Sequence, residues 1–269
     1  MFKKLYRIAL ISLLTCLCLA DDMILNYGQY EVQLNSYSIS GSQYFDTYKD
    51  KHPTQLNGQT HDYKQSGYSL GFRYGASATT TYVVKANWKS RELASYSSDG
   101  FHSYYLGVQL RRSAGIYHAF QWNIGYRGNG SYDEKDDLPL GSRASSWEAT
   151  GSYVLSLNPF HGYSLFDVGY RFRGGDLSDE ITFKSLISFS LTERFELQFQ
   201  YDMHESKEHA RETFRVLRYP NESGRQQAAL NMKLLLGKRL FLEGSFQKVL
   251  KGRNVFQTDG FQIGMTWLL

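Results

Sequence analysis

Two short stretches contain residue types that can do chemistry. Gly67-Tyr68-Ser69-Leu70-Gly71 matches the G-x-S-x-G pattern that exposes a nucleophilic serine between a strand and a helix. Here the match lies inside an alternating segment that continues to Tyr74. His204-Glu205 with His209 is similar to a zinc-protease pair, but a spacing of five instead of four does not put both imidazoles on one helical face. We therefore expect no enzyme, no catalytic residue, no metal site and no cofactor.

The remaining polar residues follow a different rule, because they recur at every second position. The clearest case is the segment from Phe195 to His204. Its apolar residues are Phe195, Leu197, Phe199, Tyr201 and Met203, and they alternate with the polar residues Glu196, Gln198, Gln200, Asp202 and His204. A period of two puts these sets on opposite faces of a β-strand. Burying the polar face in a soluble core would cost several kcal/mol for each charge, whereas a water-filled lumen solvates it. About twelve segments of the chain show this alternation.

The last segment alternates in the same way. Phe261, Ile263, Met265 and Trp267 are separated by Gln262, Gly264 and Thr266, as expected of a strand with one face in lipid. The stretch Phe261–Leu269 resembles the C-terminal signal that the outer-membrane assembly machinery recognises in bacterial β-barrels, although that signal usually ends in an aromatic residue. Outer-membrane lipid and this machinery are the expected partners.

The first twenty residues predict export. Lys3, Lys4 and Arg7 precede an apolar run, and Cys18-Leu19-Ala20 provides a small-x-small cleavage site, so residues 1–20 are expected to be a cleaved signal peptide. A lipoprotein is the alternative, but neither Cys16 nor Cys18 follows the small residue that its processing needs. Removing this segment removes both cysteines and leaves 27 basic and 26 acidic residues, a net charge of +1. That balance gives no case for nucleic acid.

The connections between segments also alternate in length. Short ones are expected near 76–79, 113–115, 158–162, 192–194 and 237–239, and longer ones near 41–65, 90–100, 128–144, 174–180, 205–223 and 251–260. This order is typical of a barrel with both termini in the periplasm. Residues 21–269 are therefore predicted to form one domain, an all-β, transmembrane, antiparallel up-and-down β-barrel of about 12 strands in the outer membrane of a Gram-negative bacterium.

Two stretches in the second half of the chain resemble one family. Asp167-Val-Gly-Tyr-Arg-Phe-Arg-Gly-Gly-Asp176, followed by Asp179-Glu180 and Leu191-Thr-Glu-Arg-Phe195, and Gly252-Arg-Asn254 before the closing strand are similar to outer-membrane channel or transport proteins named for the meta-pathway of phenol degradation. The resemblance covers mainly residues 163–269. It implies a barrel that passes small solutes, including aromatic or apolar ones.

Inward positions of the predicted strands supply the candidate site residues. The lumen or selectivity candidates are Arg73, Lys85, Arg127, Glu148, Asp167, Arg171, Arg173, Glu196, Asp202, Lys233 and Glu243. Asp176, Asp179 and Glu180 form a candidate cluster at the loop mouth, around the Gly174-Gly175 turn. The lumenal charges can pair and brace the wall, or they can select solutes as charge rings do in pores. Both roles stay open at this point, as does solute binding by the mouth cluster.

Three functions follow from these expectations. The first is a channel for passive passage of small solutes. The second is an occluded structural or surface-interaction barrel whose long loops, 205–223 above all, meet a partner. The third is a membrane hydrolase such as the outer-membrane phospholipase, but His102-Ser103-Tyr104 and His204-Glu205-Ser206 lack the His-x-Ser-Asn pattern of that enzyme.

Overall fold

The computed structural model describes residues 25–46, 48–56, 58–113, 117–131, 138, 140, 145–158, 160–174, 177–207 and 223–269. The predicted signal peptide, Asp176 and most of the segment 205–223 lie outside these ranges. Within them, no helix is long and apolar enough to cross a membrane.

Twelve long strands form one closed antiparallel barrel, which confirms the predicted fold class. The strands are β1 (Tyr30–Phe45), β5 (Tyr63–Ser77), β6 (Thr80–Leu93), β7 (Tyr96–Ser113), β8 (His118–Asn129), β9 (Ser146–Ser156), β10 (Gly162–Arg173), β11 (Glu180–Ser190), β12 (Phe195–Ser206), β13 (Gly224–Leu235), β14 (Leu240–Arg253) and β15 (Val255–Leu268). Each strand pairs with the next in this order, and β15 pairs back onto β1 from Glu31 opposite Leu268 to Phe45 opposite Val255. No barrel strand is left with an open edge, as hydrocarbon requires.

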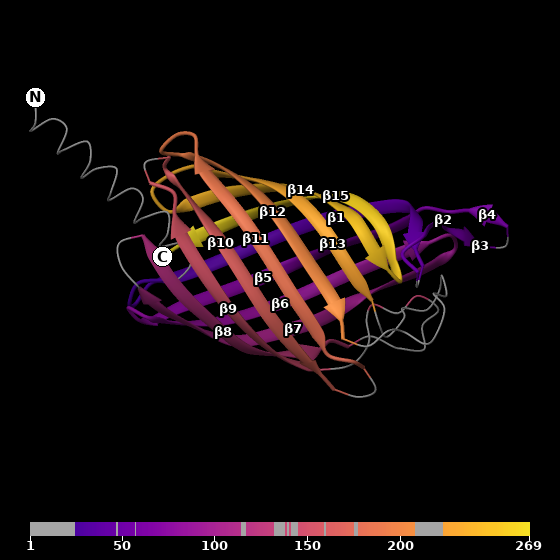
Figure 1. Cartoon of the computed structure of the whole chain (residues 1–269), viewed down its shortest axis with the longest axis horizontal. Helices are drawn as coiled ribbons and strands as arrows, with labels where there is room; N and C mark the ends of the chain where they lie inside the picture. The colour runs from indigo at the N-terminus through magenta and orange to yellow at the C-terminus, as the bar shows by residue number, and fades with distance from the viewer. Residues whose placement is uncertain are drawn as a thin grey trace, which may run out of the picture.

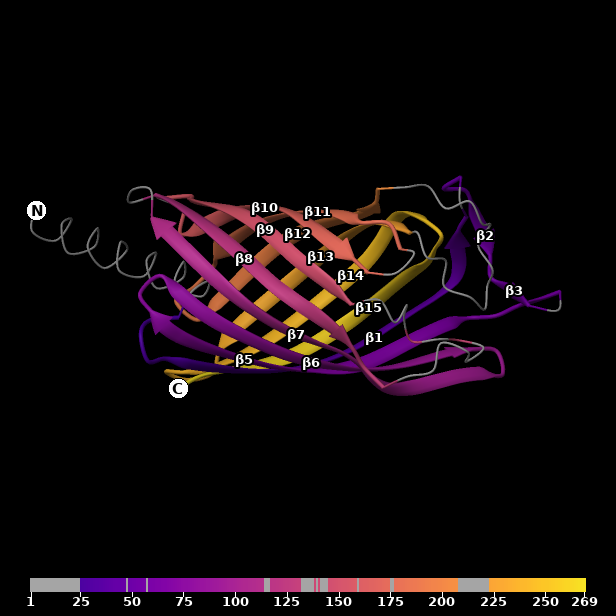
Figure 2. The same ribbon diagram turned by 90° about the horizontal axis from the view of Figure 1, so that it is seen from below.

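The two ends of the barrel differ (Figures 1 and 2). At the end where the C-terminus lies, called here the turn end, connections of five or fewer residues follow β5, β7, β9, β11 and β13. These are the five short turns predicted from sequence. At the opposite end, called here the loop end, the chain between β1 and β5 forms three short strands, β2 (Lys51–Pro53), β3 (Gln55–Leu56) and β4 (Gln59–Thr60). Of these, β2 extends the barrel by pairing with the end of β1.

Two of the six predicted long loops are wrong. Residues 90–100 and 251–260 lie mostly in strands, and only Ala94-Ser95 separates β6 from β7 while Asn254 alone separates β14 from β15. Ala94 and Asn254 have positive φ angles of 55° and 53°, the left-handed conformation that such tight reversals need. Asn adopts it readily, but Ala does so rarely. At the loop end, the pairs β6–β7 and β14–β15 are therefore longer than the predicted order of long and short connections indicated.

The barrel has its apolar residues outside and its polar residues inside. On the outer face Tyr68 is 61% exposed, Trp147 59% and Val168 60%. Inside, Glu31 and Glu196 are only 2% and 4% exposed. A continuous apolar surface of this kind is stable when lipid covers it. The polar face that would destabilise a soluble core lines the interior instead.

Candidate solute pathway in the barrel lumen

A ladder of ion pairs crosses four adjacent strands near the loop end of the lumen. On the first rung Nε of Arg127 (β8) donates to Oε1 of Glu148 (β9) at 2.7 Å. The same carboxylate oxygen lies 2.8 Å from Nε of Arg171 (β10). Nη1 of Arg171 then donates to Glu180 (β11) at 2.6 Å, and Nη1 of Arg173 lies 3.0 Å from the other oxygen of Glu180. The cross-strand register causes this contact, since Arg171 is directly opposite both Glu148 and Glu180.

A second ion pair lies on the wall formed by β1 and β5. Nη1 of Arg73 donates to both carboxylate oxygens of Glu31 at 2.9 and 3.0 Å, and its Nη2 donates to Gln109 at 3.0 Å. Lys85 of β6 is directly opposite Gly71 of β5 on one side and Tyr105 of β7 on the other. Together with the ladder, Arg73 and Lys85 give the wall from β5 to β10 an excess of positive charge. We call it the basic wall.

The other lumenal candidates lie on β10 to β14. Asp167 and Asp202 are both directly opposite Lys184 of β11, and Gln200 donates to Asp202 at 2.6 Å. Glu196 is opposite Lys233, which is in turn opposite Glu243. Thus all eleven candidates occupy inward positions, but the structure divides them between a basic wall and this more acidic one.

Two residues of the predicted mouth cluster, Asp179 and Glu180, lie in the described ranges. Glu180 belongs to the ladder, while Asp179 accepts hydrogen bonds from the Tyr170 hydroxyl at 2.8 Å and from the Arg173 backbone N–H at 3.1 Å. The Tyr170 hydrogen bond holds the pKa of Asp179 below its ordinary value. Asp179 therefore joins the end of β10 to the residue that precedes β11.

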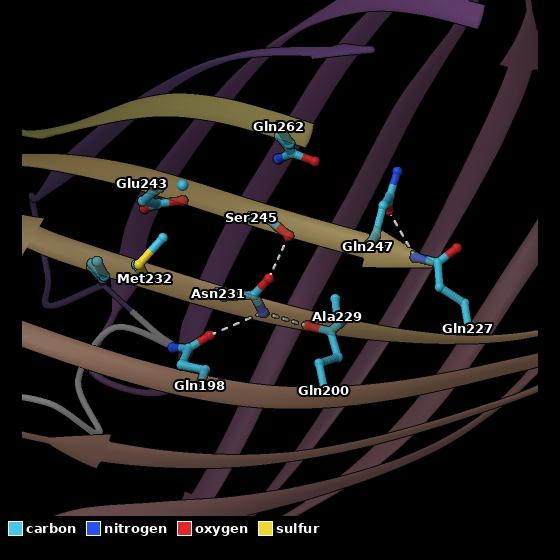
Figure 3. Close-up of a pocket in the computed structure, with 12 residues that line it drawn as sticks. Gln198, Gln200, Gln227, Ala229, Asn231, Met232, Glu243, Ser245, Gln247 and Gln262 are labelled. Atoms are coloured by element: carbon cyan, nitrogen blue, oxygen red, sulfur yellow. Dashed lines mark hydrogen bonds between the residues drawn. The ribbon is translucent and has the colours of Figure 1, made fainter. Parts of the chain in front are cut away.

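The wall opposite the basic one carries a group of neutral amides that the sequence analysis did not single out. A cavity of about 300 Å³ opens there into the lumen (Figure 3). Its lining comes from β12 to β15 and comprises Gln198, Gln200, Gln227, Ala229, Asn231, Met232, Lys233, Glu243, Gly244, Ser245, Gln247 and Gln262. We call Gln198, Gln200, Gln227, Asn231, Ser245, Gln247 and Gln262 the amide wall. Sequence alternation predicted inward positions for several of these, but not that the register gathers them.

Asn231 is the centre of the amide wall. Its Nδ2 donates to Gln200 at 3.1 Å and to Gln198 at 3.5 Å, and its Oδ1 accepts from Ser245 at 2.6 Å. Gln227 donates separately to Gln247 at 2.8 Å. These bonds fix the side chains around Asn231 in position at the cavity.

Apolar residues line the lumen at both ends, and alternation did not predict them. Near the turn end, Ala119, Val154, Tyr163, Leu165 and Leu186 form a buried cluster on four neighbouring strands. Gln198 of the amide wall donates to the Tyr163 hydroxyl at 3.3 Å. The amide wall therefore lies beside an apolar patch on β8 to β11 near the turn end.

The loop end is narrowed by aromatic packing and by the connection between β8 and β9. Tyr63 and Phe256 stack with centroids 3.9 Å apart, and Leu138 packs into the same cluster. Ser98 donates to the Leu138 carbonyl at 2.5 Å, and Lys89 Nζ donates to the Leu140 carbonyl at 3.3 Å. This part of the connection is thus held inside the mouth.

One glycine position shows how closely side chains lie against the basic wall. A Cβ on Gly125 would come within 2.3 Å of the ring of Tyr105, so that ring lies directly against the glycine. The Arg127 guanidinium is 5.7 Å from the centre of the same ring. Glycine here keeps a large aromatic side chain out of the central space.

Other chemistry finds no support in the described ranges. The G-x-S-x-G match lies within β5, without the strand–turn–helix geometry that activates a serine. No group of three or more His, Cys, Asp or Glu side chains there could hold a metal ion. His204 lies within β12, in the alternating segment from Phe195 to His204.

Comparison with known proteins gives a fold relationship. No family model matches the chain, and no curated protein matches it by sequence, so membership of the family that the sequence resembles is not confirmed. An outer-membrane channel from Pseudomonas putida F1 matches with a TM-score of 0.76 and 9% identity, covering 91% of this chain and 97% of that one. The NanC porin matches with a TM-score of 0.55 and 8% identity over 88% and 98%, and the KdgM porin with 0.53 and 4% over 87% and 98%. The chain therefore has the fold of outer-membrane β-barrel channels.

Proposed function

We propose that this protein is an outer-membrane channel for the passive passage of small solutes. One observation carries the proposal: a lumen lined by charged and amide side chains lies inside a barrel whose outer face is apolar. A polar interior of this kind retains water, and water in the lumen is the first requirement for passage. The similar channel fold supports the same function.

The charges of the lumen support a selectivity role in addition to bracing. The ladder contains three arginines and two glutamates, and it lies on the same wall as Lys85. No described residue forms an ion pair with Lys85. We therefore propose that the basic wall favours anions over cations, as positive rings do in other pores. The apolar sections at both ends limit passage to small molecules.

Planar-bilayer recording tests this function. We expect stepwise conductance from the purified, heat-modifiable protein and a reversal potential that indicates anion preference in a KCl gradient. Lys85→Met should reduce that preference, while Lys64→Met, which removes the same charge from an exposed position on the outward face of β5, should not. A folded protein with no conductance at any voltage would refute the channel and favour an occluded barrel.

The occluded barrel is the second candidate, since Leu138 and Leu140 are buried in the mouth. If it is correct, the loop end would serve as a surface for a partner. Deletion strains separate the two functions, because only loss of a channel reduces uptake of a permeant solute. The prediction that both termini face the periplasm, which places the loop end outside the cell, can be tested by protease accessibility in whole cells.

A further inference from the structure

The amide wall has the properties of a binding site. Its cavity of about 300 Å³ is at the lower end of the roughly 300–1,000 Å³ found for small-molecule sites. The side chains around it come from four adjacent strands, β12 to β15, so the sheet itself fixes their spacing. Figure 3 shows how these side chains lie. Sites built on strands hold their polar groups more precisely than sites on loops.

Unused hydrogen-bonding groups lie on one side of this cavity. Gln262 makes no side-chain hydrogen bond to any residue in the described ranges. Gln247 accepts from Gln227, which leaves the NH₂ group of Gln247 and the carbonyl of Gln227 available. An amide supplies two donors and an acceptor with two lone pairs. Three glutamines thus present both donors and acceptors to one solute.

This combination suits hydroxyl groups. Each hydroxyl both donates and accepts, and therefore pairs with either end of an amide. A carboxylate or phosphate only accepts and would leave the glutamine carbonyls unpaired, at a cost of about 1–3 kcal/mol for each buried group. The charged residues in the lining, Lys233 and Glu243, are opposite each other in the register and balance each other. The carboxylates of Glu196 and Asp202, which accept from Gln198 and Gln200, would repel an anion.

An aromatic hydrocarbon fits this cavity less well. Ala229 and Met232 are the apolar side chains in its lining, and Met232 lies largely on the outer face, with 44% of its surface exposed. An apolar solute would remove water from the amides without replacing its hydrogen bonds.

We propose that the amide wall binds a neutral, polyhydroxylated solute of about monosaccharide size as that solute passes through the lumen. The proposal rests on the channel function above and specifies its substrate class. Gln227, Gln247 and Gln262 make the direct contacts, and Asn231 keeps the neighbouring amides in place.

Saturation-transfer NMR on detergent-purified, folded protein tests the proposal without requiring conductance. D-glucose is the neutral probe, with glucuronate and benzyl alcohol as its anionic and aromatic counterparts. We expect saturable transfer to glucose and weaker transfer to the other two. The double variant Gln247→Leu/Gln262→Leu should weaken glucose binding about 25-fold, from about fivefold for each lost hydrogen bond.

Gln121→Leu is the matched control, because Gln121 also faces the lumen but lies on β8 in the opposite wall. It should bind glucose as the unchanged protein does. If the double variant does not fold, Gln262→Leu alone removes no hydrogen bond between described residues and should weaken binding about fivefold.

The outcomes separate this inference from the proposed function. Conductance with no saturable glucose transfer, or equal binding by the double variant and the control, overturns the amide-wall site and leaves the channel intact. Glucose binding that the variant abolishes, in a protein without conductance, overturns the channel and keeps the site. Stronger transfer to benzyl alcohol than to glucose would show that the solute class is wrong.

Discussion

Tyr201→Arg would place a positive charge on the outward face of β12, where we expect lipid. The strand has 12 residues and therefore a length of about 40 Å, or roughly 28 Å along the membrane normal at a tilt of about 45°. That span is close to the apolar band of about 25 Å. Position 201 is six residues from the turn end of the strand, which places its Cα at a depth of about 14 Å, near the midplane.

At this depth an arginine should destabilise the folded barrel by about 2–4 kcal/mol. Long side chains reach toward the headgroups and reduce this cost at shallower positions, so the midplane gives the sharpest test. The measurement is reversible urea unfolding from lipid vesicles, followed by tryptophan fluorescence, with the heat-modifiable gel shift as a check on folding.

Gln200→Arg is the matched control, since it adds the same charge at the adjacent residue but on the lumenal face. Asp202 is within reach there, because Gln200 already donates to it. The arginine cannot accept the hydrogen bond that Asn231 donates to Gln200, and we expect a loss of about 1 kcal/mol. If Tyr201→Arg were as stable as the unchanged protein, or if Gln200→Arg were the less stable of the two, the assignment of faces would be refuted.

Four further changes test separate features of the molecule. Glu148→Gln leaves Arg127 and Arg171 without their shared counter-ion, and since Glu148 is 18% exposed we expect a loss of about 2–4 kcal/mol in urea unfolding; an unchanged midpoint would contradict the role of the ladder in bracing. Gly125→Ala should push the Tyr105 ring into the lumen and lower single-channel conductance, and a conductance equal to that of Gly151→Ala, where a Cβ meets nothing within 4 Å, would count against this packing. Leu140→Ala removes a fully buried side chain at the mouth and should raise conductance; no increase would mean that Leu140 does not narrow the path. Leu269→Phe should increase assembly in the outer membrane, measured as the folded fraction in cells, if Phe261–Leu269 is the recognised segment, and a lower yield than Leu269→Ala would oppose that.

The sequence predicted the strands well because each carries its own evidence. Alternation is a local property, and Phe195 to His204 needs no knowledge of its neighbours to show two faces. Turn prediction failed where the local residues are atypical, as at Ala94, because alanine rarely adopts the positive φ found there. The expected loop at 90–100 was wrong for that reason.

The arrangement of the lumen depends on register, which alternation does not specify. Facing was predictable for Arg171, but its pairing with both Glu148 and Glu180 follows from how three strands align. The amide wall was missed for the same reason, since Asn231 and Gln247 each look like an ordinary water-facing residue. Val154 and Leu186 were missed because an apolar residue at an inward position breaks the rule used to find strands.

The pairing of β1 with β15 has a consequence for biogenesis. β1 begins at Tyr30 and β15 ends at Leu268. The contact that closes the barrel therefore joins positions separated by almost the whole polypeptide. Contacts of such long range form late and slowly, and every earlier species has two unsatisfied edges that attract other chains. Premature stop codons anywhere in the gene should therefore give aggregation-prone products that quality-control proteases remove, with no partial activity.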